Sequence, residues 1–215
     1  VFLSIPPEYA FHRVELIRQI SMPIILISTE YGARSMWDWE QVTYLKAEGI
    51  QIMAPYTQEM SRILLRTAGF RRRMKESRLL VWMDEKREHS SYYFFDSQCV
   101  ERIRSAFGVE VVFSSFKELN ERAMAIPDET ARYEAGAHVV LKEDVRGSRL
   151  LKAYKLYIAM REEILRTPGV IGISCACLDE PEYTDTTPCL AFNLLNRELG
   201  VAVACEGDVL SLMTE

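Results

Sequence analysis

Two acidic residues near the end of the sequence have the types and spacing of a catalytic or metal-binding pair. Glu206 and Asp208 follow the apolar run 201–205 and are separated only by Gly207. Such a run predicts a buried strand, and ligands of open parallel sheets bind at the carboxyl ends of strands. Carboxylates there suit a hard divalent cation such as Mn²⁺ or Mg²⁺, or a proton transfer. The alternative is structural, with Asp208 as a helix N-cap and Glu206 solvated.

A second acidic segment follows the preceding predicted strand. Its four carboxylates belong to Asp179, Glu180, Glu182 and Asp185. If the two strands are neighbours, both acidic segments border one crevice. Acids at strand–helix junctions are commonly solvated or cap helices, so we expect few of the four to contact a ligand.

Four of the five cysteines lie in the same part of the chain, at Cys175, Cys177, Cys189 and Cys205. Their spacing is not that of a zinc finger. Cys175 and Cys177 share one face of a predicted strand, and cysteine behaves as a small apolar residue in cores. The pattern therefore favours burial over a metal or nucleophile role.

Several common functional motifs are absent from the sequence. It has no phosphate loop, no G-x-G-x-x-G after a strand and no G-x-S-x-G elbow, which excludes the commonest nucleotide-binding and hydrolase classes. The basic run 71–73 could bind phosphate or acidic lipid, but it is more typical of a solvated helix face. The aromatic segments 35–40 and 90–95 could stack on a sugar ring, although core packing is the more usual role.

Composition points to a cytoplasmic protein without a nucleic-acid or membrane partner. The 26 basic and 31 acidic residues give a net charge of −5, which argues against a broad nucleic-acid surface. There is no apolar run of about 18 residues and no signal peptide. An odd number of cysteines without such a signal indicates a reducing compartment.

Apolar runs and amphipathic segments alternate along the chain. Strands are predicted at residues 1–5, 23–29, 50–54, 78–84, 109–115, 169–178 and 201–208, and helices at 6–20, 35–49, 57–77, 96–107, 144–167 and 187–200. Residues 116–138 are helix-like with weaker periodicity. The alternation predicts an α/β fold of two Rossmann-like three-layer domains with mainly parallel sheets.

Two of these helices carry specific expectations. Helix 144–167 is predicted to bury one face, formed by Leu150, Leu151, Tyr154, Tyr157, Ile158 and Leu165. In the last long helix, Thr187 is predicted as N-cap, Pro188 as first residue and Gly200 as the stop.

We place a domain boundary after Ser77. Residues 1–77 then form a first α/β domain, incomplete at its N-terminus, and residues 78–215 a second that carries the E-G-D motif. The chain begins without Met, apparently inside a strand, and closes inside a helix. We therefore expect a segment of a longer polypeptide.

Residues 186–214, TTPCLAFNLLNRELGVAVACEGDVLSLMT, resemble the L-fucose isomerase and L-arabinose isomerase family. The likeness lies in the TPCLA helix start, the LN…G helix end and ACEGD before a further helix. GVIGISCACL is similar to the preceding strand of the fucose-isomerase branch. MPIILISTEYGA and RLLVWMD fall where the family has strands of its first two α/β domains. The resemblance covers most of this chain, but only the middle of a family-length protein.

The resemblance implies a metal-dependent aldose–ketose isomerase that moves a proton between sugar carbons through an enediol. It makes Glu206 a metal ligand, usually for Mn²⁺, and an acid/base candidate, with Asp208 as a helix cap or as an orienting group. The family's remaining carboxylate and histidine ligands lie beyond the motif, in a C-terminal domain absent here. We therefore expect this segment alone to be inactive, and the protein to be a homo-oligomer.

Two other hypotheses remain. The chain could be a non-catalytic sugar-binding or interaction module on the same scaffold, or a cysteine-based zinc domain. The sequence does not identify the sugar, because substrate choice depends on loop shapes and hydroxyl contacts that no motif encodes.

Overall fold

A computed structural model describes residues 12–26, 36–84, 97–138, 147–177 and 186–214. The fold is mixed α/β with parallel strands, which confirms the predicted α/β class and its parallel sheets. The strand predicted at residues 1–5 and the acidic segment 178–185 lie outside the described ranges. The chain divides into two compact units, residues 1–72 and 73–215, with the division inside helix α4.

The first unit is a small parallel α/β arrangement. It contains α2 (Val14–Arg18), β1 (Ile24–Ile25), α3 (Met36–Ala47), β2 (Ile52–Met53) and most of α4 (Gln58–Lys75). β1 and β2 pair in parallel, with Ile24 opposite Ile52. The buried core is formed by Ile17, Val42, Leu45, Ile50 and Ile52.

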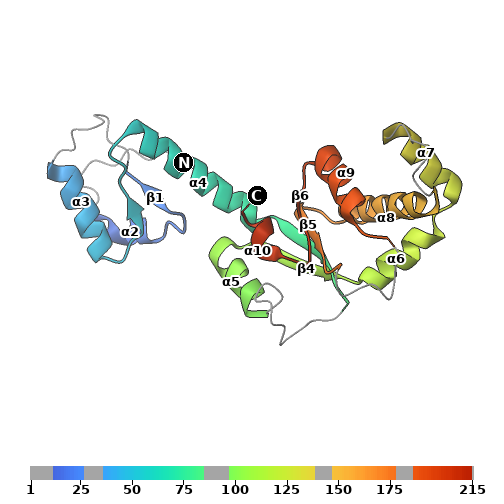
Figure 1. Ribbon diagram of the computed structural model, residues 1–215. Helices are drawn as coiled ribbons and strands as arrows, with labels where there is room; N and C mark the ends of the chain where they lie inside the picture. The colour runs from blue at the N-terminus through green and yellow to red at the C-terminus, as the bar shows by residue number, and fades with distance from the viewer. Residues whose placement is uncertain (1–11, 27–35, 85–96, 139–146, 178–185, 215) are drawn as a thin grey trace. The chain divides into compact units, whose positions relative to one another are not determined.

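The second unit is built on a four-stranded parallel sheet in the order β4-β3-β5-β6. The strands are β3 (Arg78–Trp82), β4 (Glu110–Ser114), β5 (Val170–Cys175) and β6 (Ala202–Ala204). The helices are α5 (Ser97–Phe107), α6 (Phe116–Ala125), α7 (Asp128–His138), α8 (Gly147–Arg166), α9 (Cys189–Leu199) and α10 (Val209–Leu212). Figure 1 shows these helices on both sides of the sheet.

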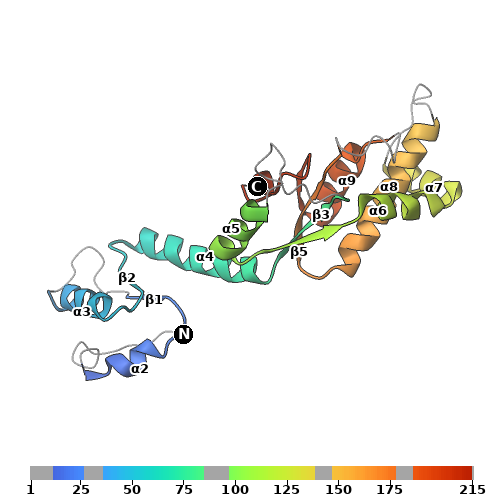
Figure 2. The ribbon, with the colours of Figure 1, turned by 90° about the horizontal axis from the view of Figure 1, so that it is seen from below.

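Strand β3 explains why the second unit has three layers. Leu80 and Trp82 point into a core shared with α6, α7, α8 and α9, while Leu79 and Val81 point into a core shared with α5 and α10. Because successive side chains of a strand face opposite sides, a strand covered on both faces must be apolar throughout. The uninterrupted apolar run LLVW, residues 79–82, is buried throughout, as this position requires. Figure 2 shows helices α5 and α8 on opposite sides of the strands.

The weakly periodic stretch 116–138 forms two helices rather than one. Ser115 caps α6 by accepting a hydrogen bond from the Glu118 amide at 3.1 Å. The helix ends at Ala125, because Ile126 precedes Pro127 and takes an extended conformation, with φ −67° and ψ 130°. Helix α7 then starts at Asp128. The proline accounts for the interrupted periodicity.

The predicted core face of the long helix is right for most of its residues. Tyr154, Tyr157 and Ile158 are buried in α8, and Leu150 and Leu151 pack against the same core. The prediction is wrong for Leu165, which is 68% exposed, whereas Ile164 is buried. Helix α8 packs against α6, α7 and α9. Leu165, in its last turn, lies outside the face that these helices cover.

The start of α9 also differs from the prediction. Pro188 rather than Thr187 is the N-cap, with φ −74° and no side-chain cap, and its carbonyl accepts the first helical bond from the Phe192 amide at 2.8 Å. The predicted stop at Gly200 is confirmed, with φ 66° in the left-handed region. Within the described ranges, none of the helices combines the length and apolar character needed to span a bilayer.

Candidate functional site

The strand order of the second unit defines where a ligand would bind. From β3 the chain passes to β4 on one side and then crosses to β5 on the other. Helix α5 joins the core on one face of the sheet, and helices α6–α9 join the core on the opposite face. In open α/β sheets ligands bind outside the carboxyl ends of the strands, where the order reverses. The edge that follows Trp82, Cys175 and Ala204 is therefore the candidate site.

Glu206 lies at this edge, in a tight turn that follows β6. The turn is closed by a hydrogen bond from the Asp208 amide to the Cys205 carbonyl at 3.1 Å. Both central residues are left-handed, with φ 60° at Glu206 and 74° at Gly207. Glycine adopts this conformation freely, whereas a side chain with a Cβ is disfavoured there by about 1–2 kcal/mol. Glu206 is the one non-glycine residue of positive φ in the described part of the chain.

The carboxylate of Glu206 has no structural task among the described residues. The residue is half-buried, and no hydrogen bond or ion pair to its side chain is found within the described ranges. Residues held in sparsely populated backbone conformations cluster at functional sites. The conformation and the unengaged carboxylate together make Glu206 the leading candidate of this edge.

Asp208 has a structural role. Its Oδ1 accepts hydrogen bonds from the amides of Leu210 at 2.9 Å and Ser211 at 3.0 Å, and its Oδ2 accepts one from the Ser211 hydroxyl at 2.6 Å. It is thus the N-cap of α10, as in the structural alternative considered from the sequence. With both oxygens engaged, Asp208 fixes the turn that presents Glu206.

Three of the cysteines are less buried than their spacing predicts. Cys175 is fully buried, but Cys177 is half-buried, and Cys189 and Cys205 are exposed. Strand β5 ends at Cys175, so the alternation of faces that suggested burial does not extend to Cys177.

The Cys177 and Cys205 sulfurs lie 3.3 Å apart. Partial desolvation of the thiol raises the pKa of Cys205 to about 11, and the adjoining Cys177 thiol contributes to the same shift.

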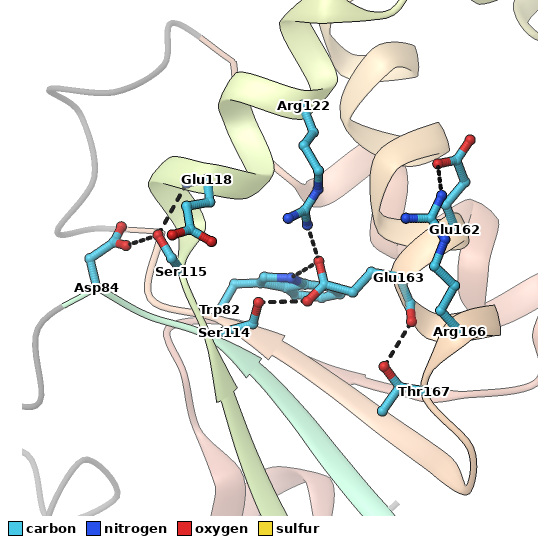
Figure 3. A network of polar contacts seen from close by, with 10 residues as sticks. All are labelled: Trp82, Asp84, Ser114, Ser115, Glu118, Arg122, Glu162, Glu163, Arg166 and Thr167. Atoms are coloured by element: carbon cyan, nitrogen blue, oxygen red, sulfur yellow. Dashed lines mark hydrogen bonds and ion pairs between the residues drawn. The ribbon is translucent and has the colours of Figure 1, made fainter.

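Asp84 follows β3 at the same edge and was not singled out from the sequence. Its carboxylate accepts hydrogen bonds from the Ser115 hydroxyl and from the Lys117 amide, the latter at 2.9 Å. It therefore stabilises the start of α6 together with Ser115, as Figure 3 shows. Both of its oxygens are engaged, so Asp84 positions β3 against α6 rather than offering a free carboxylate.

Glu163 on α8 is the centre of the polar network drawn in Figure 3. Its carboxylate accepts a hydrogen bond from Trp82 Nε1 at 3.1 Å, one from the Ser114 hydroxyl at 2.5 Å, and a charged contact from Arg122. The side chain is 18% exposed. These contacts connect the ends of β3 and β4 to α6 and α8. They also provide the donors that a carboxylate needs when it is removed from water. This role of Glu163 could not be predicted from the sequence, because its partners are distant along the chain.

The described residues do not by themselves complete a metal site. They contain no group of three or more His, Cys, Asp or Glu side chains able to hold a metal ion. Glu206 supplies one hard oxygen ligand, whereas the neighbouring thiols are ligands of soft metals. Asp179, Glu180, Glu182 and Asp185 lie outside the described ranges.

Comparisons with known proteins do not assign the chain to a family. It matches no protein-family model, and none of the curated proteins compared with it is a significant match.

Proposed function

We propose that the chain is a segment of a metal-dependent aldose–ketose isomerase that acts on a sugar such as L-fucose or L-arabinose. The observation that carries the proposal is the turn at Glu206. A glutamate is held there in a left-handed conformation at the carboxyl edge of a parallel sheet, with its carboxylate unengaged by the described residues. The resemblance of residues 186–214 to the fucose/arabinose isomerases supports the same assignment.

In this proposal Glu206 acts as the general acid and base. Its carboxylate takes a proton from the carbon next to the sugar carbonyl and returns it to the carbonyl carbon through an enediol. The proton of the adjacent hydroxyl passes to the former carbonyl oxygen, so that the hydroxyl carbon becomes the new carbonyl. A carboxylate without fixed partners can approach both carbons, and half-burial keeps it near the edge of the sheet. A divalent cation, Mn²⁺ on the resemblance, would stabilise the negative charge that develops on the sugar oxygens.

The remaining metal ligands must come from elsewhere. A hard divalent cation takes several oxygen ligands, and the described residues contain no group of three or more side chains that could hold one. We propose that the other ligands belong to residues outside the described ranges or to a second copy of the chain in a homo-oligomer. A monomer of this segment would then have little activity.

A non-catalytic sugar-binding module is the second candidate. It is favoured by one observation: the part of the chain that the structure describes lacks a group of three metal-ligating side chains. Such a module would bind sugar with the same affinity in the presence and absence of Mn²⁺, and Glu206→Gln would leave that affinity nearly unchanged.

The two candidates are distinguished by assaying the full-length protein that contains this segment for ketose formation from a panel of aldoses, with and without Mn²⁺. For the isomerase we expect Mn²⁺-dependent conversion that Glu206→Gln lowers about 10²–10⁴-fold, because the amide cannot move the proton. Glu101→Gln, which changes an exposed acid on α5, is the matched control and should retain full activity. A fully active Glu206→Gln protein excludes the proposed role, and sugar binding without turnover supports the binding module.

A further inference from the structure

Two thiols meet at the carboxyl edge of the second unit's sheet. Cys177 follows β5 and Cys205 follows β6, and their sulfurs are 3.3 Å apart. Cys205 is exposed and Cys177 is half-buried, so a small molecule can reach the pair from solvent. Both cysteines are free thiols, and neither has a part in the isomerase chemistry proposed above.

The backbone fixes the two cysteines in this arrangement. Ser174 pairs with Ala204 in the parallel ladder, so the residues that follow them, Cys175 and Cys205, leave neighbouring strands at the same end. The Cys177 amide donates a hydrogen bond to the Cys175 carbonyl at 2.8 Å, so the chain turns back and brings Cys177 toward Cys205. On the other strand, the turn closed by Asp208 holds Cys205. The backbone therefore brings the ends of the two strands together, and the two thiols meet there.

The separation of the sulfurs favours a covalent bond over a shared metal ion. A disulfide has an S–S length of about 2.05 Å, so each sulfur would move by only about 0.6 Å. Two thiolates on a tetrahedral zinc ion, with Zn–S bonds of about 2.3 Å, lie roughly 3.8 Å apart. The observed 3.3 Å is shorter than that, and no group of three metal-ligating side chains is found in the described ranges.

We propose that Cys177 and Cys205 form a reversible intramolecular disulfide, and that the pair is a dithiol site for small-molecule disulfides such as oxidised glutathione. One protein thiolate attacks a sulfur of the small disulfide, which breaks its S–S bond and releases one small thiolate. The second protein thiolate attacks the mixed disulfide and releases the other. The two protons from the cysteines pass to the released thiolates. The protein loses two electrons, and the small disulfide gains them.

The test equilibrates the purified chain with buffers of oxidised and reduced glutathione, alkylates the free thiols under denaturing conditions and maps the peptides by mass. We expect a product about 2 Da lighter before alkylation, a linked Cys177–Cys205 peptide, and full reversal by reduced glutathione. Cys189→Ser should leave the bridge unchanged, since Cys189 is exposed but not part of the pair. Cys205→Ser should abolish it and leave glutathione attached to Cys177.

Two results would overturn the proposal. One is a wild-type protein that accumulates only glutathione adducts, with no bridged peptide at any buffer ratio. The other is a bridge that survives in Cys205→Ser through Cys189. If Cys205→Ser fails to fold, Cys177→Ser serves as the second variant, and it should likewise abolish the bridge and leave glutathione attached to Cys205. The bridge is measured by peptide mass and not by activity, so its failure leaves the isomerase proposal intact.

Discussion

Glu163 and Glu206 both lie at the carboxyl end of the second unit's sheet, but their surroundings differ. Glu163 accepts bonds from Trp82, Ser114 and Arg122 and is 18% exposed. Glu206 has no such donors among the described residues, and its backbone is held at φ 60°. The first carboxylate stabilises the fold, because it satisfies groups that are removed from water. The second belongs to a residue in a backbone conformation that non-glycine residues disfavour, and residues in such conformations cluster at functional sites.

The largest stability effect should come from removing the engaged acid. Glu163→Ala leaves the Trp82, Ser114 and Arg122 donors without their acceptor, and we expect a loss of about 2–4 kcal/mol in the free energy of unfolding. Urea denaturation measures this. Its neighbour Glu162 is the matched control, because it is 52% exposed and pairs with Arg166 on the same helix.

Glu162→Ala should change stability by less than about 0.5 kcal/mol, as for other exposed ion pairs. Glu206→Gln should fall in the same small range. Equal losses in the Glu163 and Glu206 variants would remove the distinction between the two acids.

A second engaged acid, Glu198 on α9, predicts a pH effect. It accepts a hydrogen bond from the Tyr157 hydroxyl, and Arg161 Nη1 donates to that hydroxyl at 3.0 Å. Burial, with the bond to Glu198, raises the pKa of Tyr157 from 10.0 to about 12. Between pH 10 and 12 only the unfolded chain releases this proton, so the tyrosine's contribution to stability is present below pH 10 and is lost as the pH rises.

We expect that contribution to amount to about 2 kcal/mol over this window. Tyr157→Phe isolates it, because the phenylalanine protein lacks the ionising group while keeping the ring. The difference in unfolding free energy between wild type and Tyr157→Phe should shrink as the pH rises from 10 to 12. A difference that stays constant over the window contradicts the shifted pKa.

The cap beside Glu206 should have a smaller effect. Asp208→Ala removes the acceptor of the Leu210 and Ser211 amides, and we expect a loss of about 1 kcal/mol in unfolding free energy. Asp208→Asn keeps a capping oxygen and should lose only a few tenths of a kcal/mol. If the alanine variant is as stable as wild type, Asp208 does not hold the turn, and the presentation of Glu206 needs another explanation.

The parts of the fold that could be predicted are those that depend on residues close together in the sequence. Continuous apolar runs such as LLVW predict strands buried on both faces, and Gly200 predicts the end of α9. Glu206 was found as a candidate because it directly follows a strand and precedes Gly207. The structural role of Asp208 was foreseen as an alternative for the same local reason.

The remaining features depend on contacts between distant residues. Glu163 meets Trp82 across 81 positions and Arg122 across 41, so its helical context gives no sign of the network. Cys177 and Cys205 are 28 positions apart and meet because β5 ends at Cys175. The apolar run continues past this point, so the sequence pattern does not show where the strand ends. The left-handed conformation of Glu206 was also unforeseen, because glycine at position 207 signals a turn without identifying which of its residues is strained.

The most direct measurement is the unfolding free energy of Glu206→Gly. Glycine at a left-handed position relieves the strain, and after the entropy that it adds to the unfolded chain we predict a stabilisation of about 0.5–1 kcal/mol. Glu101→Gly, the same substitution in the interior of helix α5, should instead destabilise by about 1 kcal/mol. A Glu206→Gly protein that is less stable than wild type would contradict the claim that Glu206 is held there for function and not for the fold.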